Sequence, residues 1–183
     1  MRLSKPRVAP TQRAGWDTDQ AEVAARFGDG TVANVFATML HHPALFRRWL
    51  PFANHILGKS TISVRDREVL ILRTAWMVRS EYEWGQHVLI ARDAGMSEEE
   101  IAMARNGPDT PGLDQRDRLL LAATDELVDD AFVSDATWDG LSRFYDTRQM
   151  MDIVFTVGQY NMLAMGLNSF GVQRDEGVPG FDD

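Results

Sequence analysis

Three side chains in this sequence combine residue types and a spacing that suit proton transfer. Glu83 and His87 stand four residues apart, so at about 100° per residue they lie on the same side of a helix. Ser80 falls in the same sector, which also carries apolar residues such as Trp84 and Ile90 and therefore faces the core. A carboxylate, an imidazole and a hydroxyl on a buried stripe are suited to general acid–base chemistry.

The preceding helix repeats this pattern with a second acid. Glu68 shares a sector with Ile71 and Leu72, so it also faces the core. A buried carboxylate is costly unless it is paired or protonated, so we expect Glu68, Glu83 and His87 to meet as the catalytic group and to perturb one another's pKa. Two simpler interpretations stay open: an ordinary helix pair between Glu83 and His87, and a cap or ion pair that Glu68 forms with Arg65, Arg73 or Arg79.

Three further residues are candidates for binding a substrate: Ser80, Trp84 and Tyr160. A serine directly before a helix is also typical of a cap, which is the simpler role for Ser80. Tyr160 and Asn161 interrupt a strongly apolar helix, where they either line a pocket or satisfy buried groups or a partner subunit. His55, on another apolar helix, is typical of a core or pocket-rim histidine.

The motifs of metal and cofactor enzymes are missing from the sequence. Glu68, Glu83 and His87 would make three zinc ligands with one open position, but their spacing matches no metal motif. There is no glycine-rich phosphate loop, no dinucleotide-binding fingerprint and no Gly-x-Ser-x-Gly elbow. The sequence therefore predicts neither a metal nor a cofactor.

The elements that hold these residues are predicted to be helices throughout. Two long proline-free stretches, 52–107 and 112–178, have helical periodicity and little strand alternation, which indicates an all-α helical bundle. Ser97 with Glu100 fits a capping box. The predicted helices of these stretches lie near 64–79, 81–94, 98–105, 115–129, 135–145 and 147–169.

Length and composition favour one domain with two irregular ends. Of the 183 residues, we expect 1–18 to form an extended N-terminal arm, 19–173 the helical domain and 174–183 a flexible acidic tail. A net charge of −8 disfavours nucleic acid as a partner. No stretch approaches the ~20 apolar residues that span a bilayer, and there is no cysteine, so a cytoplasmic protein without a membrane partner is expected.

A short motif occurs twice along the chain. Arg65-Asp66-Arg67 recurs as Arg116-Asp117-Arg118, and each copy opens a predicted helix. The similarity is either chance between two amphipathic helix starts or the trace of an old duplication that packs two related helical units.

Three stretches carry a resemblance to a known family: 65–68, 80–87 and 94–101. Together they resemble the carboxymuconolactone decarboxylase family, also called AhpD-like, and the likeness extends over roughly 30–172. It implies a fold of packed helical units assembled as a homo-oligomer, based on trimers or dimers. The redox branch of the family uses a Glu, a Cys-x-x-Cys pair and a His, which correspond here to Glu68, to Ser80 and Glu83, and to His87.

The missing thiols decide which activity the resemblance implies. A hydroxyl and a carboxylate cannot form the sulfenic acid and disulfide of thiol peroxidase turnover, which disfavours that activity. The decarboxylase branch needs no cofactor and keeps a histidine at this place. We therefore expect a lyase-type acid–base enzyme that acts on a small carboxylated lactone or organic acid. The alternatives are a family member with a peroxidase label but no thiol activity, and a non-catalytic small-molecule binding protein.

Overall fold

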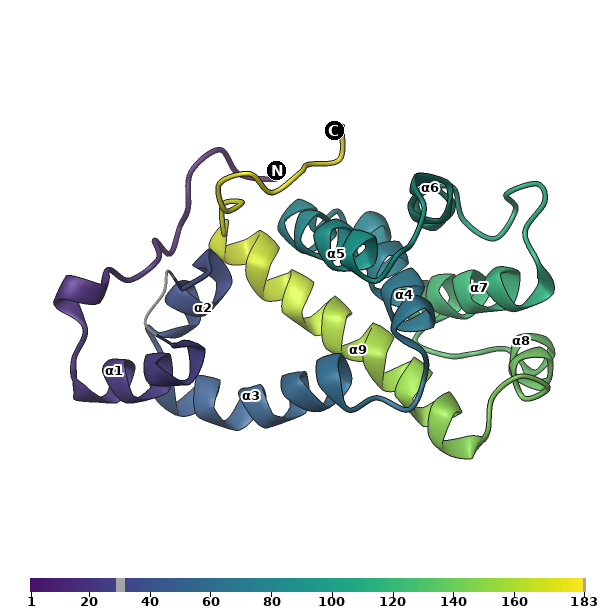
Figure 1. Cartoon of the computed structure of the whole chain (residues 1–183), viewed down its shortest axis with the longest axis horizontal. Coiled ribbons are helices and arrows are strands. Elements are labelled where there is room, and N and C mark those ends of the chain that lie inside the picture. The colour runs from purple at the N-terminus through teal and green to yellow at the C-terminus, as the bar shows by residue number, and fades with distance from the viewer. Residues whose placement is uncertain (29–31, 183) are drawn as a thin grey trace.

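The computed structural model describes residues 1–28 and 32–182. These residues form α-helices joined by loops and short 3-10 turns, without a strand among them, which confirms the predicted all-α class (Figure 1). The helices are α1 Thr18–Ala24, α2 Asn34–Met39, α3 Pro43–Gly58, α4 Val64–Met77, α5 Glu81–Asp93, α6 Glu98–Asn106, α7 Gln115–Asp130, α8 Asp135–Leu141 and α9 Thr147–Phe170, with 3-10 turns at Arg13–Gly15 and Ala25–Phe27.

Side chains at the helix starts explain several of these boundaries. Ser97 begins α6 by accepting a hydrogen bond from the backbone N–H of Glu100, whose carboxylate bonds back to Ser97, as the capping box predicts. Asp146 and Gln149 form the same reciprocal pair at the start of α9. Ser80 stands at the corresponding position before α5, yet its hydroxyl makes no capping hydrogen bond. Its side chain is therefore not used to begin the helix.

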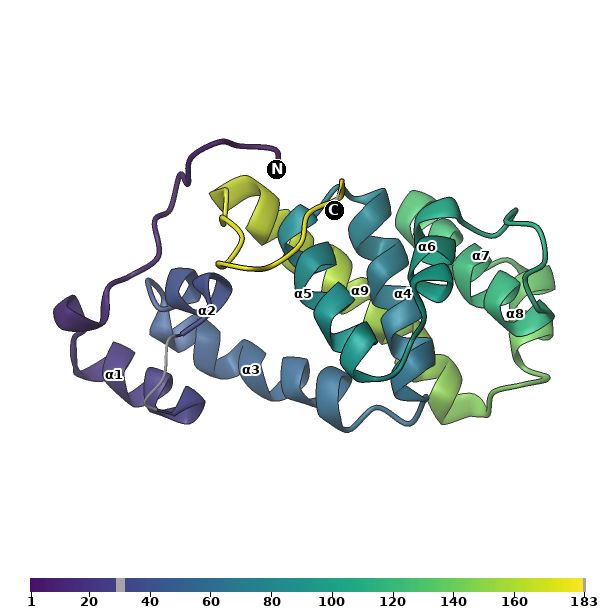
Figure 2. The same ribbon diagram turned by 45° about the horizontal axis from the view of Figure 1, so that its top comes forward.

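Helix α4 lies at the centre of the bundle and packs against α5, α6, α7 and α9 (Figure 2). Its apolar residues Val69, Leu70 and Leu72 are fully buried in the main hydrophobic core. A smaller aromatic cluster, with Phe36 and Phe46 stacked on each other, joins α1, α2 and α3 to one another. Because α4 packs against α5 and three other helices, polar side chains between α4 and α5 are buried.

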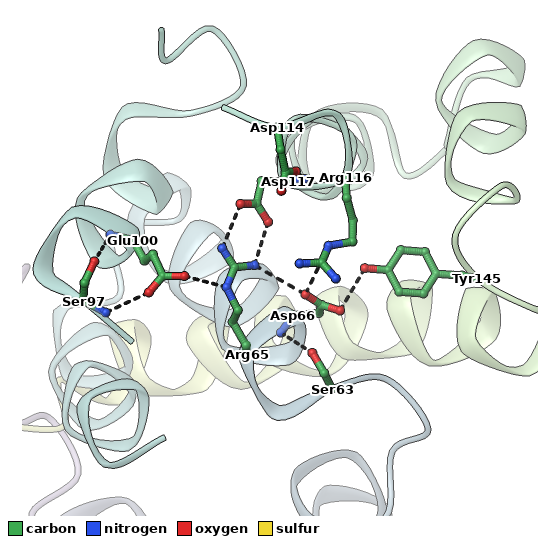
Figure 3. A network of polar contacts seen from close by, with 9 residues as sticks. All are labelled: Ser63, Arg65, Asp66, Ser97, Glu100, Asp114, Arg116, Asp117 and Tyr145. Carbon is green, nitrogen blue, oxygen red and sulfur yellow. Dashed lines mark hydrogen bonds and ion pairs between the residues drawn. The ribbon is translucent and has the colours of Figure 1, made fainter. Parts of the chain in front are cut away.

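The repeated motif pairs with itself across the interface of α4 and α7 (Figure 3). Arg65 donates two hydrogen bonds to Asp117, at 2.7 and 2.8 Å. In the opposite direction, Arg116 approaches Asp66 with 3.9 Å between Nε and Oδ1, and the Tyr145 hydroxyl donates to the other oxygen of Asp66. The Arg-Asp pairs of the two copies therefore cross, each arginine meeting the aspartate of the other copy.

Both ends of the chain run over the helical domain. In the N-terminal arm, the backbone N–H groups of Arg7 and Val8 donate to the carbonyl oxygen of Phe170, at the end of α9. The sequence favours a flexible tail over 174–183. In the structure Gly180 of this segment is buried, Glu176, Gly177 and Asp182 are exposed, and Asp183 lies outside the described residues. The ring of Phe181 lies against Trp76 and Trp84.

The C-terminal segment passes so close to α5 that only a glycine leaves room for it. A Cβ atom at Gly85 would lie 2.1 Å from the carbonyl oxygen of Pro179.

Within the described part of the chain, no helix combines the length and apolar character that crossing a membrane requires.

Candidate functional site

Glu68 of α4 and His87 of α5 form a buried pair. The Nδ1 atom of His87 lies 2.6 Å from Oε2 of Glu68, and both residues are almost completely removed from solvent. The other carboxylate oxygen of Glu68 accepts a hydrogen bond from Nε of Arg67 at 2.9 Å. Arg67 also donates to the backbone oxygen of Leu57, so its guanidinium is held in place. The expectation that Glu68 and His87 meet agrees with this geometry.

The charge of Glu68 fixes the orientation of the histidine. Although burial would raise it, the pKa of Glu68 lies below its usual value because His87 and Arg67 stabilise the carboxylate. An ionised carboxylate only accepts hydrogen bonds, so Nδ1 of His87 carries the proton that is shared with Glu68. The Nε2 atom, on the other side of the ring, is then free to accept or return a proton.

Tyr160 of α9 packs against this imidazole. The two rings meet edge to face, with centroids 4.8 Å apart and planes at 88°. Burial raises the pKa of Tyr160 far above its usual value, and the nearby Glu68 and Glu83 raise it further. The phenol therefore stays protonated throughout the physiological range.

Glu83 is buried beside this group but is not bonded to it. Its side chain is 2% exposed, and neither carboxylate oxygen has a hydrogen-bonding partner among the described residues. Burial raises its pKa well above the usual value, and the Ser80 hydroxyl, which would lower it, offsets this only in part. The structure thus contains no Glu83–His87 pair of the ordinary helix type.

A cavity of about 250 Å³ opens beside His87, between α2, α3, α5 and α9. Most of its wall is apolar or aromatic. The polar side chains on it include Glu83, His87, Tyr160 and Gln159. The side-chain oxygen of Gln159 accepts a hydrogen bond from the indole N–H of Trp49 at 3.2 Å. Apolar and aromatic wall residues are Ala33, Val35, Phe36, Trp49, Leu50, Ala53, Leu57, Ile90, Leu163 and Leu167.

The structure brings some of the predicted site residues to this cavity and leaves others away from it. His87, Glu83 and Tyr160 line the wall, and Glu68 lies behind His87. Ser80 is fully buried and acts on Glu83 without lining the cavity. Trp84 does not reach it.

Trp84 instead belongs to the opposite side of α5. Its ring packs between those of Trp76 and Phe181, below the guanidinium of Arg105. It lines a separate cavity of about 150 Å³.

Neither of the other two candidate pocket residues lies on the cavity wall. His55 is half exposed and pairs with Asp152, with 3.5 Å between Nε2 and Oδ1. Asn161 is likewise absent from the wall. Sequence reasoning missed Trp49 and Gln159, because their hydrogen bond joins α3 to α9 across 110 positions. The only local signal was the polar Gln159 within an apolar helix.

Within residues 1–28 and 32–182, no three His, Cys, Asp or Glu side chains come together in a way that would hold a metal ion. The thiols of the redox pattern are absent from the sequence itself, which contains no cysteine.

The helical fold of this protein is AhpD-like, as solved structures of similar fold show. The sequence model described as "Carboxymuconolactone decarboxylase family" matches residues 43–126, the region that holds Glu68, Glu83 and His87. This segment of the chain is therefore similar to the carboxymuconolactone decarboxylase family. No curated protein matches the sequence.

Solved structures share the fold over nearly the whole chain. The alkylhydroperoxidase AhpD core of an uncharacterized peroxidase-related protein from Ralstonia eutropha JMP134 has a TM-score of 0.78 at 16% identity, covering 92% of this chain and 93% of its own. An uncharacterized peroxidase-related protein from Silicibacter sp. TM1040 has a TM-score of 0.77 at 18% identity, and the match covers 96% of this chain and 97% of its own. A cysteine-to-alanine variant of the debrominase Bmp8, in complex with 2,3,4-tribromopyrrole, has 0.75 at 15% identity, covering 94% of each chain. At these identities the likeness shows a common fold.

Proposed function

We propose that this protein is a cofactor-independent acid–base enzyme of the decarboxylase type, acting on a small carboxylated lactone or organic acid. The observation that carries the proposal is the cavity beside His87, whose Nδ1 side is fixed by the buried carboxylate of Glu68. A histidine held in one tautomer, with its second nitrogen free, is the arrangement that general acid–base catalysis requires.

The chemistry follows from what His87 can deliver. When a carboxylate leaves as carbon dioxide, the electron pair of the broken C–C bond remains on carbon and needs a proton. The imidazolium of His87 supplies that proton from Nε2, and solvent restores it afterwards. Glu68 stabilises the imidazolium by its ion pair, since the two atoms are 2.6 Å apart.

The charges of the pair and its neighbour suit an acidic substrate. Arg67 balances the carboxylate of Glu68, so protonation of His87 leaves one net positive charge on the three side chains. Glu83 offsets this charge less than a solvated carboxylate would, because burial raises the pKa of its carboxyl group. A single substrate carboxylate is then attracted to the cavity, whose wall includes His87.

Two alternatives are less well supported. Thiol peroxidase activity needs cysteines, and Ser80 and Glu83 stand where the redox branch has them. A protein that kept the fold and lost the chemistry would be expected to close its polar residues into a network without a cavity. The open cavity beside His87 argues against that alternative.

Assembly into a homo-oligomer is also part of the proposal. Helix α9 leaves large apolar side chains exposed to solvent, among them Phe155 at 52% and Met165 at 62%. Exposed apolar surface of this kind is typical of protein interfaces. Light scattering coupled to size exclusion tests this directly, and a monomer at micromolar concentration would contradict it.

Carbon dioxide release from a panel of carboxylated lactones and β-keto acids tests the function. We expect release by the wild-type protein and a decrease of about 10²–10⁴-fold in His87→Gln. His55→Gln is the matched control, because His55 is exposed and lies away from the cavity. Turnover by His87→Gln close to wild type would refute the role of His87, and release from no member of the panel would refute decarboxylation.

A further inference from the structure

Gln159 of α9 is a buried polar residue that the proposed proton transfer does not use. It is 3% exposed and lines the cavity beside His87. Its amide oxygen accepts the hydrogen bond from the indole N–H of Trp49 at 3.2 Å, which joins α9 to α3. The NH2 group on the other side of the amide makes no hydrogen bond to a described residue. The protein's own packing therefore satisfies only half of this amide.

The hydrogen bond from Trp49 fixes which way the amide points. An indole N–H only donates, so the atom that faces it is the amide oxygen, and a half-turn of the amide would lose the bond. The NH2 group therefore points away from Trp49. Its nitrogen is accessible, unlike the two carboxyl oxygens of Glu83, which are sealed from solvent. Since Gln159 lines the cavity, this accessible N–H donor opens into the cavity.

The rest of the cavity wall indicates which ligand such a donor would bind. Most of the wall is apolar or aromatic, and none of the described residues on it is a lysine or an arginine. Behind the wall, Arg67, Glu68 and His87 carry at most one net positive charge between them. A second carboxylate on the same ligand would lose its water without a cation to pair with, which is strongly unfavourable.

We propose that Gln159 binds the carboxylate of the substrate through its NH2 group, and that this substrate is an apolar ring acid with a single carboxylate. This inference rests on the proposed acid–base function and makes its substrate class narrower. Gln159 thereby holds the acid in the cavity whose wall also carries His87. Trp49 is a positioning residue, because its hydrogen bond keeps the NH2 group of Gln159 turned toward the ligand.

Three unreactive probes test this arrangement by isothermal titration calorimetry at neutral pH. Benzoate has an apolar ring and one carboxylate, toluene has the same ring without a charge, and terephthalate carries a second carboxylate. We expect the wild-type protein to bind benzoate at least tenfold more tightly than terephthalate. Gln159→Met removes the N–H donor and should weaken benzoate binding about tenfold or more, while the affinity for toluene stays within about threefold.

Toluene separates the loss of a donor from damage to the cavity. Equal losses of affinity for benzoate and toluene in Gln159→Met would overturn the inference, as would a loss for benzoate of less than threefold. Terephthalate binding as tight as that of benzoate, or no binding of benzoate by the wild type, would also overturn it. Gln115→Met, at the exposed start of α7, is the matched control and should bind all three probes as the wild type does.

The positioning role of Trp49 has a test of its own. Trp49→Phe keeps an aromatic ring on the wall and removes the N–H, so the amide of Gln159 is free to turn, and benzoate binding should weaken about three- to tenfold. In the Gln159→Met background the same replacement should change the affinity by less than twofold, because Trp49 acts through Gln159. Losses that add in the double variant would refute this role.

The same variants separate this inference from the proposed function. His87→Gln keeps Gln159, so adding Gln159→Met to it should weaken benzoate binding by the same factor, although carbon dioxide release is already lost. Probe binding that depends on Gln159 supports the inference even if no acid in the panel is decarboxylated. Decarboxylation with a KM that is indifferent to Gln159→Met supports the function and overturns the inference.

Discussion

Replacing Glu83 by glutamine should change how the stability of the protein depends on pH. Burial raises the pKa of Glu83 well above its ordinary value of 4.5, and Ser80 offsets this only in part. In the unfolded chain the carboxyl group is exposed and titrates normally. The amide in Glu83→Gln has nearly the same shape and does not titrate, so the difference between the two proteins isolates this one group.

The sign of the effect follows from which state holds the proton. Below pH 4.5 the folded and unfolded chains are both protonated at Glu83, and the stability from this group is fully present. As the pH rises above 4.5, the unfolded chain loses the proton while the folded chain keeps it. The wild type is then destabilised relative to Glu83→Gln until the pH passes the raised pKa of the folded protein.

The magnitude is set by the binding of one proton. Each pH unit in this window changes the relative folding equilibrium about tenfold, or about 1.4 kcal/mol. Between pH 5 and pH 7 the variant should therefore gain up to about 2.7 kcal/mol over the wild type. Glu68, Tyr160 and His87 are unchanged between the two proteins, so their contributions to stability largely cancel in the difference.

Urea unfolding at pH 5, 6 and 7 measures this difference. Both proteins should unfold with similar dependence on urea concentration, because the substitution leaves the buried area unchanged. A difference in stability that stays constant from pH 5 to pH 7 would show that Glu83 titrates alike in the folded and unfolded states. That outcome would refute the argument that its burial keeps it neutral.

Two other substitutions separate the cavity from the rest of α5. Gly85→Ala places a Cβ atom 2.1 Å from a carbonyl oxygen of the C-terminal segment, so it should cost about 1–3 kcal/mol in thermal or urea unfolding. The control Gly158→Ala meets no atom within 4 Å and should stabilise by up to about 1 kcal/mol, and equal effects would contradict the close approach. Trp49→Phe removes an indole hydrogen bond at the cavity wall and should raise KM about 5–10-fold for the substrate found in the panel, by the cost of one hydrogen bond. Trp84→Phe, on the other side of α5, should leave KM within twofold, and a KM effect there as large as that of Trp49→Phe would misplace the site.

The helices were the most predictable part of the structure. Local side chains define their starts, and Ser97 with Glu100 forms the predicted capping box at α6. The predicted helices 115–129 and 147–169 agree with α7 and α9 to within one residue at each end. The predicted helix 135–145 instead ends at Leu141, because its last residues form a turn into α9.

The site was predictable only where one residue pair dominates. Glu68 and His87 lie on the buried faces of two neighbouring helices, where each needs a polar partner. The helical periodicity of the sequence is enough to predict that they pair. Trp84 was predicted on the same stripe, but it packs on another side of α5. This helix is buried on more than one side, so the sequence does not show which neighbour a buried residue will contact. The cavity wall from α3, including Trp49, depends on tertiary packing that no local pattern encodes.

The flexible tail was expected from composition alone. Residues 174–183 are acidic and contain glycine and proline, which is typical of a disordered end. One aromatic residue of this segment, Phe181, nevertheless packs against two tryptophans. Composition cannot predict such a contact, because the contact depends on where the segment meets the helical domain.

Different positions of the repeated motif have different roles in its two copies. The first two residues of each copy, Arg65-Asp66 and Arg116-Asp117, hold α4 and α7 together. The fourth residue is Glu68 in one copy and Leu119 in the other, so only one copy contributes a carboxylate that pairs with His87. The ion pairs that connect α4 and α7 and the carboxylate that pairs with His87 therefore occupy different positions of the same short motif. The fourth residue can be substituted, which changes the chemistry of the site, while the ion pairs between the two helices remain.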